Sequence, residues 1–178
     1  MVFQRLFATR PEKAAGQALY ASAARQARAP GFYAALGARD TGEGRFELYT
    51  LHVALLVLRL KGQGQAAADT SQALFDAYVR ALDDGLREMG VGDLVVGKRM
   101  RKLGEAFYGR ARSYEEALAA MPDRSSLKAL LQRTVLPGAG NAEASALASY
   151  VDTAVATLQG QPVDELLRGE ARWPAPPQ

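Results

Sequence analysis

Apolar residues recur at intervals of three and four along most of the chain, and no segment alternates between apolar and polar residues for long. Such intervals place apolar side chains on one face of a helix, whereas a half-buried strand requires alternation. The pattern therefore predicts an all-α fold, a compact single-domain bundle of about six to eight helices. The longer expected helices span residues 9–28, 46–61, 70–89, 93–112, 113–120, 123–136 and 141–160.

Residue types at the ends of several of these segments support the expected helix boundaries. Thr9 and Ser113 each precede a glutamate by three residues, which is the spacing of a capping box at a helix start. The glycines at 37, 42 and 44 indicate a loop before the second long helix. Residues 1–172 are expected to form one helical domain, and Trp173–Gln178, with its three prolines, is expected to be a loose tail.

Two segments have a clear expected role in the fold. The helix over residues 46–61 is apolar almost all round, so we expect it at the centre of the bundle. Gly90 is suited to the left-handed position that closes the helix over residues 70–89. We interpret Arg87, Gly90, Gly92 and Asp93 as a structural connection that orients the next helix.

Composition excludes several kinds of chemistry. The chain has 178 residues, no cysteine and a single histidine, which rules out disulfides, thiolate metal sites and a cysteine nucleophile. The longest apolar stretch, Leu48–Leu58, is about half of the roughly 20 residues that a membrane span needs. We expect no metal and no cofactor. The first 12 residues lack a continuous apolar run, so no secretory signal is expected.

The net charge is only +3, but positive charge is concentrated in one segment. Between residues 98 and 112 six cations accompany one acid, Glu105, so the local charge is +5. On a helical wheel these cations form a broad arc opposite an apolar stripe. The stripe consists of Met100, Leu103, Phe107, Ala111 and Tyr114. Gly97 and Gly104 lie beside it, where we expect them to let another backbone approach closely.

This basic helix has three interpretations. It is the solvated face of an ordinary bundle, a docking face for an acidic partner or RNA, or a face that binds lipid headgroups at roughly 1 kcal/mol per basic residue. The candidate binding residues are Lys98, Arg99, Arg101, Lys102, Tyr108, Arg110 and Arg112.

The same region carries a longer signature. Residues 86–94 read LREMGVGDL, residues 96–101 read VGKRMR, and residues 106–110 read AFYGR. Together with the apolar helix before them, over about Phe46 to Leu118, they resemble the ubiquinol-cytochrome c chaperone family. The resemblance implies a non-enzymatic assembly chaperone that binds newly made cytochrome b and assists assembly of ubiquinol-cytochrome c reductase, respiratory complex III.

The resemblance also implies partners and a location. Mitochondrial members are associated with a small helical partner protein and with the ribosome near its tunnel exit. This sequence lacks an arginine-rich, acid-poor presequence, so we expect a bacterial member. Such a protein would be cytoplasmic and peripheral at the cytoplasmic face of the inner membrane, with anionic membrane contact and no sequence-specific nucleic acid.

Two other classes of protein remain open at this point. A small enzyme would use His52, Arg87 and the nearby acids, which are Asp83, Asp84, Glu88 and Asp93. Against it, no P-loop, dinucleotide-binding glycine pattern or zinc-protease motif is present. We interpret His52 as a core histidine bonded to a neighbour, and the acids as surface pairs and caps. A generic RNA-binding module would use Phe107, Tyr108 and the arginines, but Phe107 lies on the apolar stripe.

Overall fold

The computed structural model describes residues 11–88, 90 and 93–177, with the backbone alone at Asp93 and Leu94. These residues form eight helices and no strand, which confirms the predicted all-α bundle. The helices are α1 (Pro11–Ala27), α2 (Pro30–Ala34), α3 (Gly42–Leu60), α4 (Gln65–Glu88), α5 (Asp93–Ala119), α6 (Ser125–Thr134), α7 (Asn141–Gly160) and α8 (Val163–Leu167).

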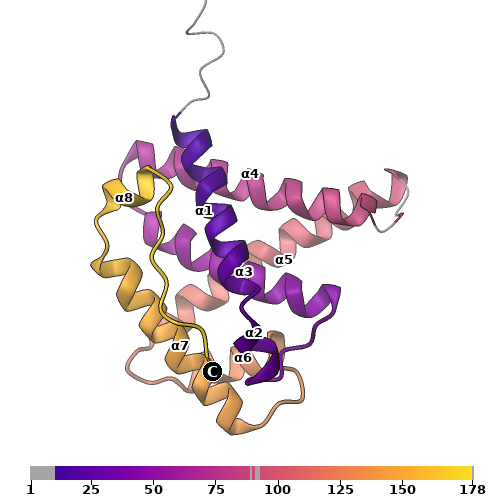
Figure 1. The fold of residues 1–178 in the computed structure, drawn as a ribbon, viewed down its shortest axis with the longest axis vertical. Coiled ribbons are helices and arrows are strands. Elements are labelled where there is room, and N and C mark those ends of the chain that lie inside the picture. Colours follow the sequence, from indigo (N-terminus) through magenta and orange to yellow (C-terminus); the bar gives the residue numbers. More distant parts are fainter. Residues whose placement is uncertain (1–10, 89, 91–92, 178) are drawn as a thin grey trace, which may run out of the picture.

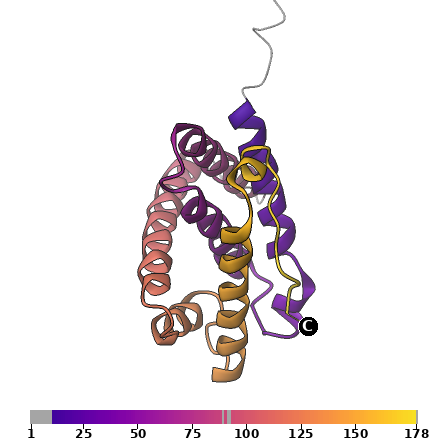
Figure 2. The ribbon, with the colours of Figure 1, turned by 90° about the vertical axis from the view of Figure 1, so that its left-hand side faces the viewer.

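Helix α3 lies at the centre of the bundle, as its apolar sequence predicts. It packs against α1, α4, α5 and α7, and Figures 1 and 2 show these helices on different sides of it. Residues that point in different directions from α3, such as Leu51, Val53 and Leu56, are all fully buried. A helix that is apolar all round needs such a complete cover because any uncovered side would expose hydrophobic surface to water.

The expected loop through Gly42 and Gly44 was wrong in part, because both glycines belong to the first turn of α3. Thr41 caps this helix, and its Oγ1 accepts a hydrogen bond from the Gly44 amide at 3.2 Å. A Cβ atom at Gly44 would lie 2.0 Å from the carbonyl oxygen of Arg39. Glycine is therefore needed at position 44 for close approach of the preceding chain, not for a loop.

The predicted break at Ser113 was also wrong, because α5 continues through it to Ala119. The hydroxyl of Ser113 donates to the Gly109 carbonyl oxygen at 2.9 Å, as is typical of a serine inside a helix. Glu116 pairs with Arg112 one turn earlier and does not close a capping box. The buried Tyr114 and Ala117 continue the apolar face, so packing favours one long helix. Thr9, the other expected cap, lies outside the described residues.

The segment after α8 crosses back over the bundle beside α1 and α7, and Figure 1 shows its end near α2. We expected a loose tail from Trp173, but Trp173 packs on the core. Its indole Nε1 donates to Ser22 Oγ at 3.1 Å, and its ring centroid lies 5.1 Å from that of His52. Gln26 Nε2 also donates to the Pro174 carbonyl oxygen at 2.9 Å. These contacts tie the C-terminal segment to α1 and α3.

Candidate binding surface on helix α5

The apolar stripe of α5 packs on α3 and α4, as its spacing predicts. Phe107 and Tyr114 are fully buried, and Met100, Leu103 and Ala111 are half-buried. The Phe107 ring lies 5.0 Å from Phe75 and 5.2 Å from Tyr78 of α4, measured between centroids. The opposite side of α5 is consequently turned to solvent.

Two of the six cations on α5 are engaged within the protein. Arg110 donates through Nε and Nη2 to the two carboxylate oxygens of Glu47 on α3, at 2.9 and 2.8 Å. This two-pronged contact raises the pKa of Arg110 and joins two neighbouring helices. Arg112 pairs with Glu116 at 2.8 Å on its own helix. Both residues were candidates for partner binding, and the structure gives Arg110 a packing role in addition.

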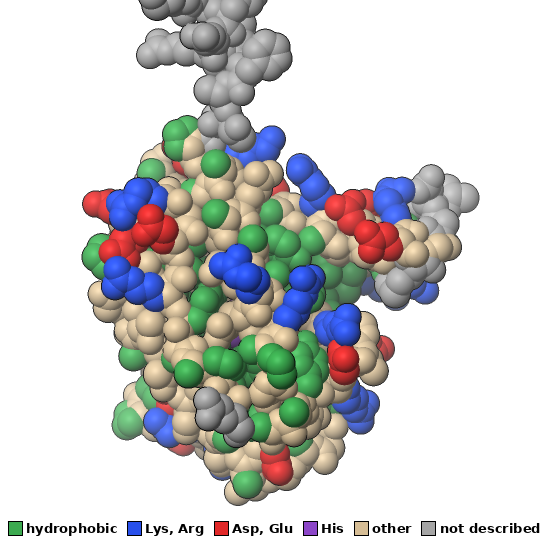
Figure 3. All heavy atoms as spheres, in the orientation of Figure 1, with side chains coloured by type: hydrophobic (Ala, Val, Ile, Leu, Met, Phe, Trp, Pro, Cys, Tyr) green, Lys and Arg blue, Asp and Glu red, His purple; other side chains and the backbone are tan. Residues whose placement is uncertain are grey.

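The other four cations are exposed, and none makes a hydrogen bond or ion pair with another described residue. We call this set the basic cluster: Lys98, Arg99, Arg101 and Lys102. It lies on the part of α5 that, with the end of α4, projects from the bundle (Figure 1). Figure 3 shows acidic and basic side chains on this projection, at the right of the view. Four exposed cations without an ion-pair partner in the described chain thus lie together on the projection, beside the acidic side chains at the end of α4.

Exposed apolar atoms accompany the basic cluster. Val95 is 48% exposed and Tyr108 is 61% exposed. The Tyr108 ring nevertheless lies 5.2 Å from Phe75, centroid to centroid, so one side of it rests on α4. The expected close approach at Gly97 and Gly104 was wrong, because a Cβ atom at either would meet no other part of the described chain within 4 Å.

Within the connection before α5, Gly90 has the left-handed backbone conformation that its place in the sequence predicts. Gly90 has a φ of +74° and donates its amide to the Arg87 carbonyl oxygen at 2.9 Å. The Arg87 side chain pairs with Asp83 on the same helix at 2.6 Å. Gly92 and the side chain of Asp93 lie outside the described residues, so their roles stay predictions.

Replacing Gly90 with valine should lower the free energy of unfolding by about 1–2 kcal/mol or more, because a β-branched residue is strained at positive φ. Gly97→Ala is the matched control on α5. Its φ is not in the positive range and its Cβ would meet open space, so it should leave stability unchanged or raise it by up to about 1 kcal/mol. Denaturant unfolding would measure both, and equal stability of Gly90→Val and the parent protein would contradict the assigned strain.

His52 is a core histidine. It is fully buried, Nδ1 donates to the Leu48 carbonyl oxygen at 2.8 Å, and Nε2 accepts from the Tyr150 hydroxyl at 2.8 Å. Burial lowers its pKa to about 4, so the neutral form fits this place. The acids considered with it, Asp83, Asp84 and Glu88, lie on the projecting end of α4. The structure therefore does not bring the candidate catalytic residues together, and the described chain contains no group of three or more potential metal ligands.

The fold and this surface define a class of protein: an all-helical protein that presents a projecting basic surface. None of the described helices is long and apolar enough to cross a membrane. The sequence matches the ubiquinol-cytochrome C chaperone family over residues 34–173, and the chain therefore belongs to this family.

A solved structure agrees with this assignment. The crystal structure of the Cbp3 homolog from Brucella abortus is similar, with a TM-score of 0.86 and 32% sequence identity. The similarity covers 98% of this chain and 97% of that one. No curated protein matches the chain. The resemblance seen in residues 46–118 thus extends over nearly the whole chain.

One contact that bears on the candidate surface was missed by sequence analysis. Glu47 neutralises Arg110 across two helices that are 63 positions apart in sequence. Its side chain is only 13% exposed. A carboxylate at the start of an apolar helix was the available signal, because a buried charge requires a partner. The signal does not identify which cation is the partner.

Proposed function

We propose that this protein is a non-enzymatic assembly chaperone that binds newly made cytochrome b and assists assembly of ubiquinol-cytochrome c reductase. It acts at the cytoplasmic face of a bacterial inner membrane and is recruited there through the basic cluster. Membership of the chaperone family supports the first part of the proposal. The absence of an assembled catalytic group among the described candidates favours binding over turnover.

The recruitment step is supported by one observation: the cations on α5 fall into two sets, one with carboxylate partners and one without. Arg110 and Arg112 have carboxylate partners within the protein, whereas the basic cluster has none in the described chain. A cation already paired gains little from a second anion, and an unpaired exposed one retains its full attraction. The attraction therefore resides in four neighbouring residues on the projecting part of α5.

The size of this attraction defines its role. At roughly 1 kcal/mol per basic residue near an anionic leaflet, four cations supply about 4 kcal/mol, which corresponds to a dissociation constant of about 1 mM. Such binding is fast and weakens as salt screens the charges. The basic cluster thus brings the chaperone to the membrane, and apolar contacts elsewhere hold the client.

The test reverses three charges of the basic cluster: Lys98, Arg101 and Lys102 to glutamate. The matched control reverses Lys13, Arg25 and Arg133, which are also exposed. Each triple change alters the charge by −6, from +3 to −3. The first variant should lose most of its salt-sensitive co-sedimentation with phosphatidylglycerol vesicles and should lower cytochrome b accumulation in cells. The control should keep both, apart from a general effect of net charge.

Three outcomes decide the proposal. Selective loss in the first variant, with an unchanged melting temperature, supports recruitment by the basic cluster. Equal behaviour of the two variants means that only net charge matters, and the recruitment step is then wrong. Binding that nuclease abolishes in a cell extract, with no binding to vesicles, would assign the cluster to ribosomal RNA and overturn the lipid assignment.

A further inference from the structure

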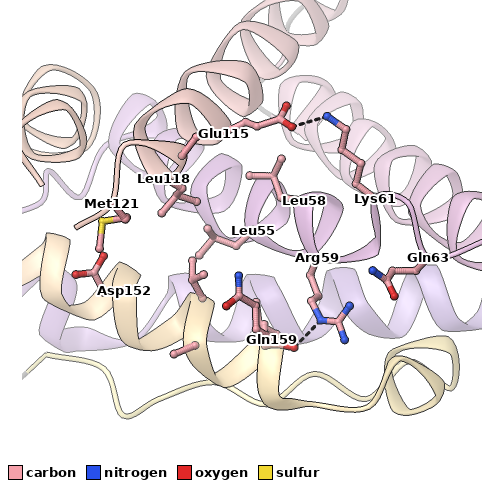
Figure 4. Close-up of a pocket in the computed structure, with 14 residues that line it drawn as sticks. Leu55, Leu58, Arg59, Lys61, Gln63, Glu115, Leu118, Met121, Asp152 and Gln159 are labelled. Atoms are coloured by element: carbon pink, nitrogen blue, oxygen red, sulfur yellow. Dashed lines mark hydrogen bonds and ion pairs between the residues drawn. The ribbon is translucent and has the colours of Figure 1, made fainter. Parts of the chain in front are cut away.

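Three large apolar side chains are exposed on the described part of the chain: Val95, Tyr108 and Met121. Met121 lines a groove that runs over the C-terminal half of α3, between α5 and α7 (Figure 4). Val95 and Tyr108 instead both lie on α5, one before and one after the basic cluster in the sequence. Exposed apolar side chains therefore accompany the unpaired cations on the same helix.

The spacing along α5 places both apolar side chains on the face that carries the cations. Seven residues are close to two helical turns, so residues seven apart lie about 20° from each other around the helix. Val95 is seven residues before Lys102, and Tyr108 is seven residues after Arg101. Because Arg101 and Lys102 are adjacent, all four residues occupy about 140° of the circumference and about 20 Å along the axis. The apolar stripe on the other side of α5 packs on α3 and α4.

We infer that Val95 and Tyr108 enter the interfacial layer of an anionic lipid bilayer, while the basic cluster binds the headgroups around them. The inference rests on the proposed recruitment to a membrane and names the residues that reach below the headgroups. The outer face of α5 then lies parallel to the membrane surface. The long side chains of the basic cluster bend back towards the headgroups, whereas the short side chain of Val95 points into the apolar layer.

The combination of side chains on this face favours a lipid surface over other anionic partners. A bilayer offers anionic headgroups with apolar chains beneath them along the whole length of the face. Tyrosine suits this boundary because its ring is apolar and its hydroxyl stays hydrated. RNA offers phosphates and stacking for Tyr108, but it offers no apolar layer for Val95. An acidic protein surface likewise presents carboxylates without an apolar layer beneath them.

Glu105 is the single acid among residues 95–108, where it accompanies four cations. It is exposed, and it lies on the same face as Arg101, four residues earlier. In the inferred orientation its carboxylate meets anionic headgroups, so Glu105→Gln should tighten binding to phosphatidylglycerol vesicles about fivefold. Glu43→Gln, at an exposed position of α3, is the control for the change in net charge and should tighten binding much less.

A series of proteins with one tryptophan each tests the insertion directly. Trp173 is the only tryptophan of the chain, so Trp173→Phe gives a background without one. In this background Tyr108→Trp and Val95→Trp place the probe on the face, and Ala146→Trp, at an exposed position of α7, is the matched control. With phosphatidylglycerol vesicles that carry bromine on their acyl chains, emission at positions 95 and 108 should shift to shorter wavelength and be quenched. Emission at position 146 should stay unchanged.

The double variant Val95→Ser, Tyr108→Ser separates insertion from charge attraction. It keeps every charge of the basic cluster, so its affinity for the vesicles should fall about tenfold at each salt concentration, with an unchanged dependence on salt. Tyr108→Phe keeps the ring and should stay within about twofold of the parent. Reversal of three charges of the basic cluster should instead reduce the salt dependence itself. Circular dichroism melting checks folding, and the tryptophan series decides if the double variant unfolds.

The outcomes distinguish this inference from the recruitment proposal. Binding to vesicles without quenching at positions 95 and 108 overturns the insertion and leaves recruitment by the basic cluster in place. Equal quenching at position 146 overturns the assigned face. Quenching at positions 95 and 108 that survives reversal of the basic cluster contradicts recruitment by that cluster and supports the insertion. A response of the probe at position 108 to single-stranded RNA and not to vesicles assigns the face to RNA and overturns the inference.

Discussion

Replacing Trp173 with alanine should lower the free energy of unfolding by about 2–4 kcal/mol. A buried tryptophan replaced by alanine typically costs 3–5 kcal/mol, and partial exposure of Trp173 reduces that figure. The variant loses the ring contact with His52 and the hydrogen bond to Ser22. For a chain of this size the expected fall in melting temperature is about 5–15 °C.

The control for this prediction is Trp173→Phe, which retains an aromatic ring and removes the indole donor. Its cost should be about 1–2 kcal/mol, since the loss is mainly one hydrogen bond and part of the ring. If the free energy of unfolding of Trp173→Ala lies within 0.5 kcal/mol of that of the parent, a margin typical of unimportant surface changes, the Trp173 side chain adds nothing to stability. Denaturant titration at neutral pH would measure all three proteins.

The C-terminal segment also shows where sequence reasoning fails in this protein. Three prolines near Trp173 indicate an extended chain, and this local inference is correct because no helix forms there. The sequence does not show that Gln26 and Ser22, about 150 positions earlier, provide the hydrogen-bonding partners. An extended segment becomes ordered through tertiary contacts, and these have no local pattern.

Helices with strong local signals were predicted well. Gly90 ends α4 as expected, because only a residue without Cβ takes its positive φ at little cost. The capping-box spacing at Ser113 misled, since a serine and a glutamate three positions apart also occur inside a helix. The apolar stripe through Tyr114 and Ala117 was the stronger evidence, because burial of that stripe outweighs a cap.

The sequence predicted where positive charge is concentrated, but it did not predict which of these cations are accessible on the folded protein. Counting cations located the basic helix, but the count does not show which of them form ion pairs in the folded protein. Glu47 removes Arg110 from the accessible set, and Glu116 pairs with Arg112. The groove over α3 was not predicted at all, because it arises from the spacing of α5 and α7 and from no motif in either helix.

The protein should lose about 3 kcal/mol of stability as the pH falls from about 6.5 to about 4, through His52 alone. Burial lowers the pKa of His52 from its ordinary 6.5 to about 4 in the folded protein. Below pH 6.5 the unfolded chain takes up a proton that the folded protein does not bind, so unfolding becomes more favourable. Each unit of difference in pKa contributes about 1.4 kcal/mol, and the loss levels off below pH 4.

The geometry around His52 explains why the folded protein resists protonation. The Leu48 carbonyl oxygen already accepts from Nδ1, so the added proton would go to Nε2, which now accepts from the Tyr150 hydroxyl. That hydroxyl also accepts from Gln26 Nε2 at 3.0 Å, so it would have to turn its own hydrogen elsewhere. No carboxylate among the described residues makes a contact with the ring that would offset the buried charge.

His52→Gln is the variant that isolates this contribution, because glutamine keeps a donor and an acceptor and does not titrate in this range. It should be less stable than the parent at pH 7.5, and the gap should narrow by about 3 kcal/mol towards pH 4. Carboxylates that titrate in the same range affect both proteins alike and cancel in the difference. If the two stability curves stay parallel between pH 7.5 and 4, the pKa of His52 is not lowered by burial and this prediction is wrong.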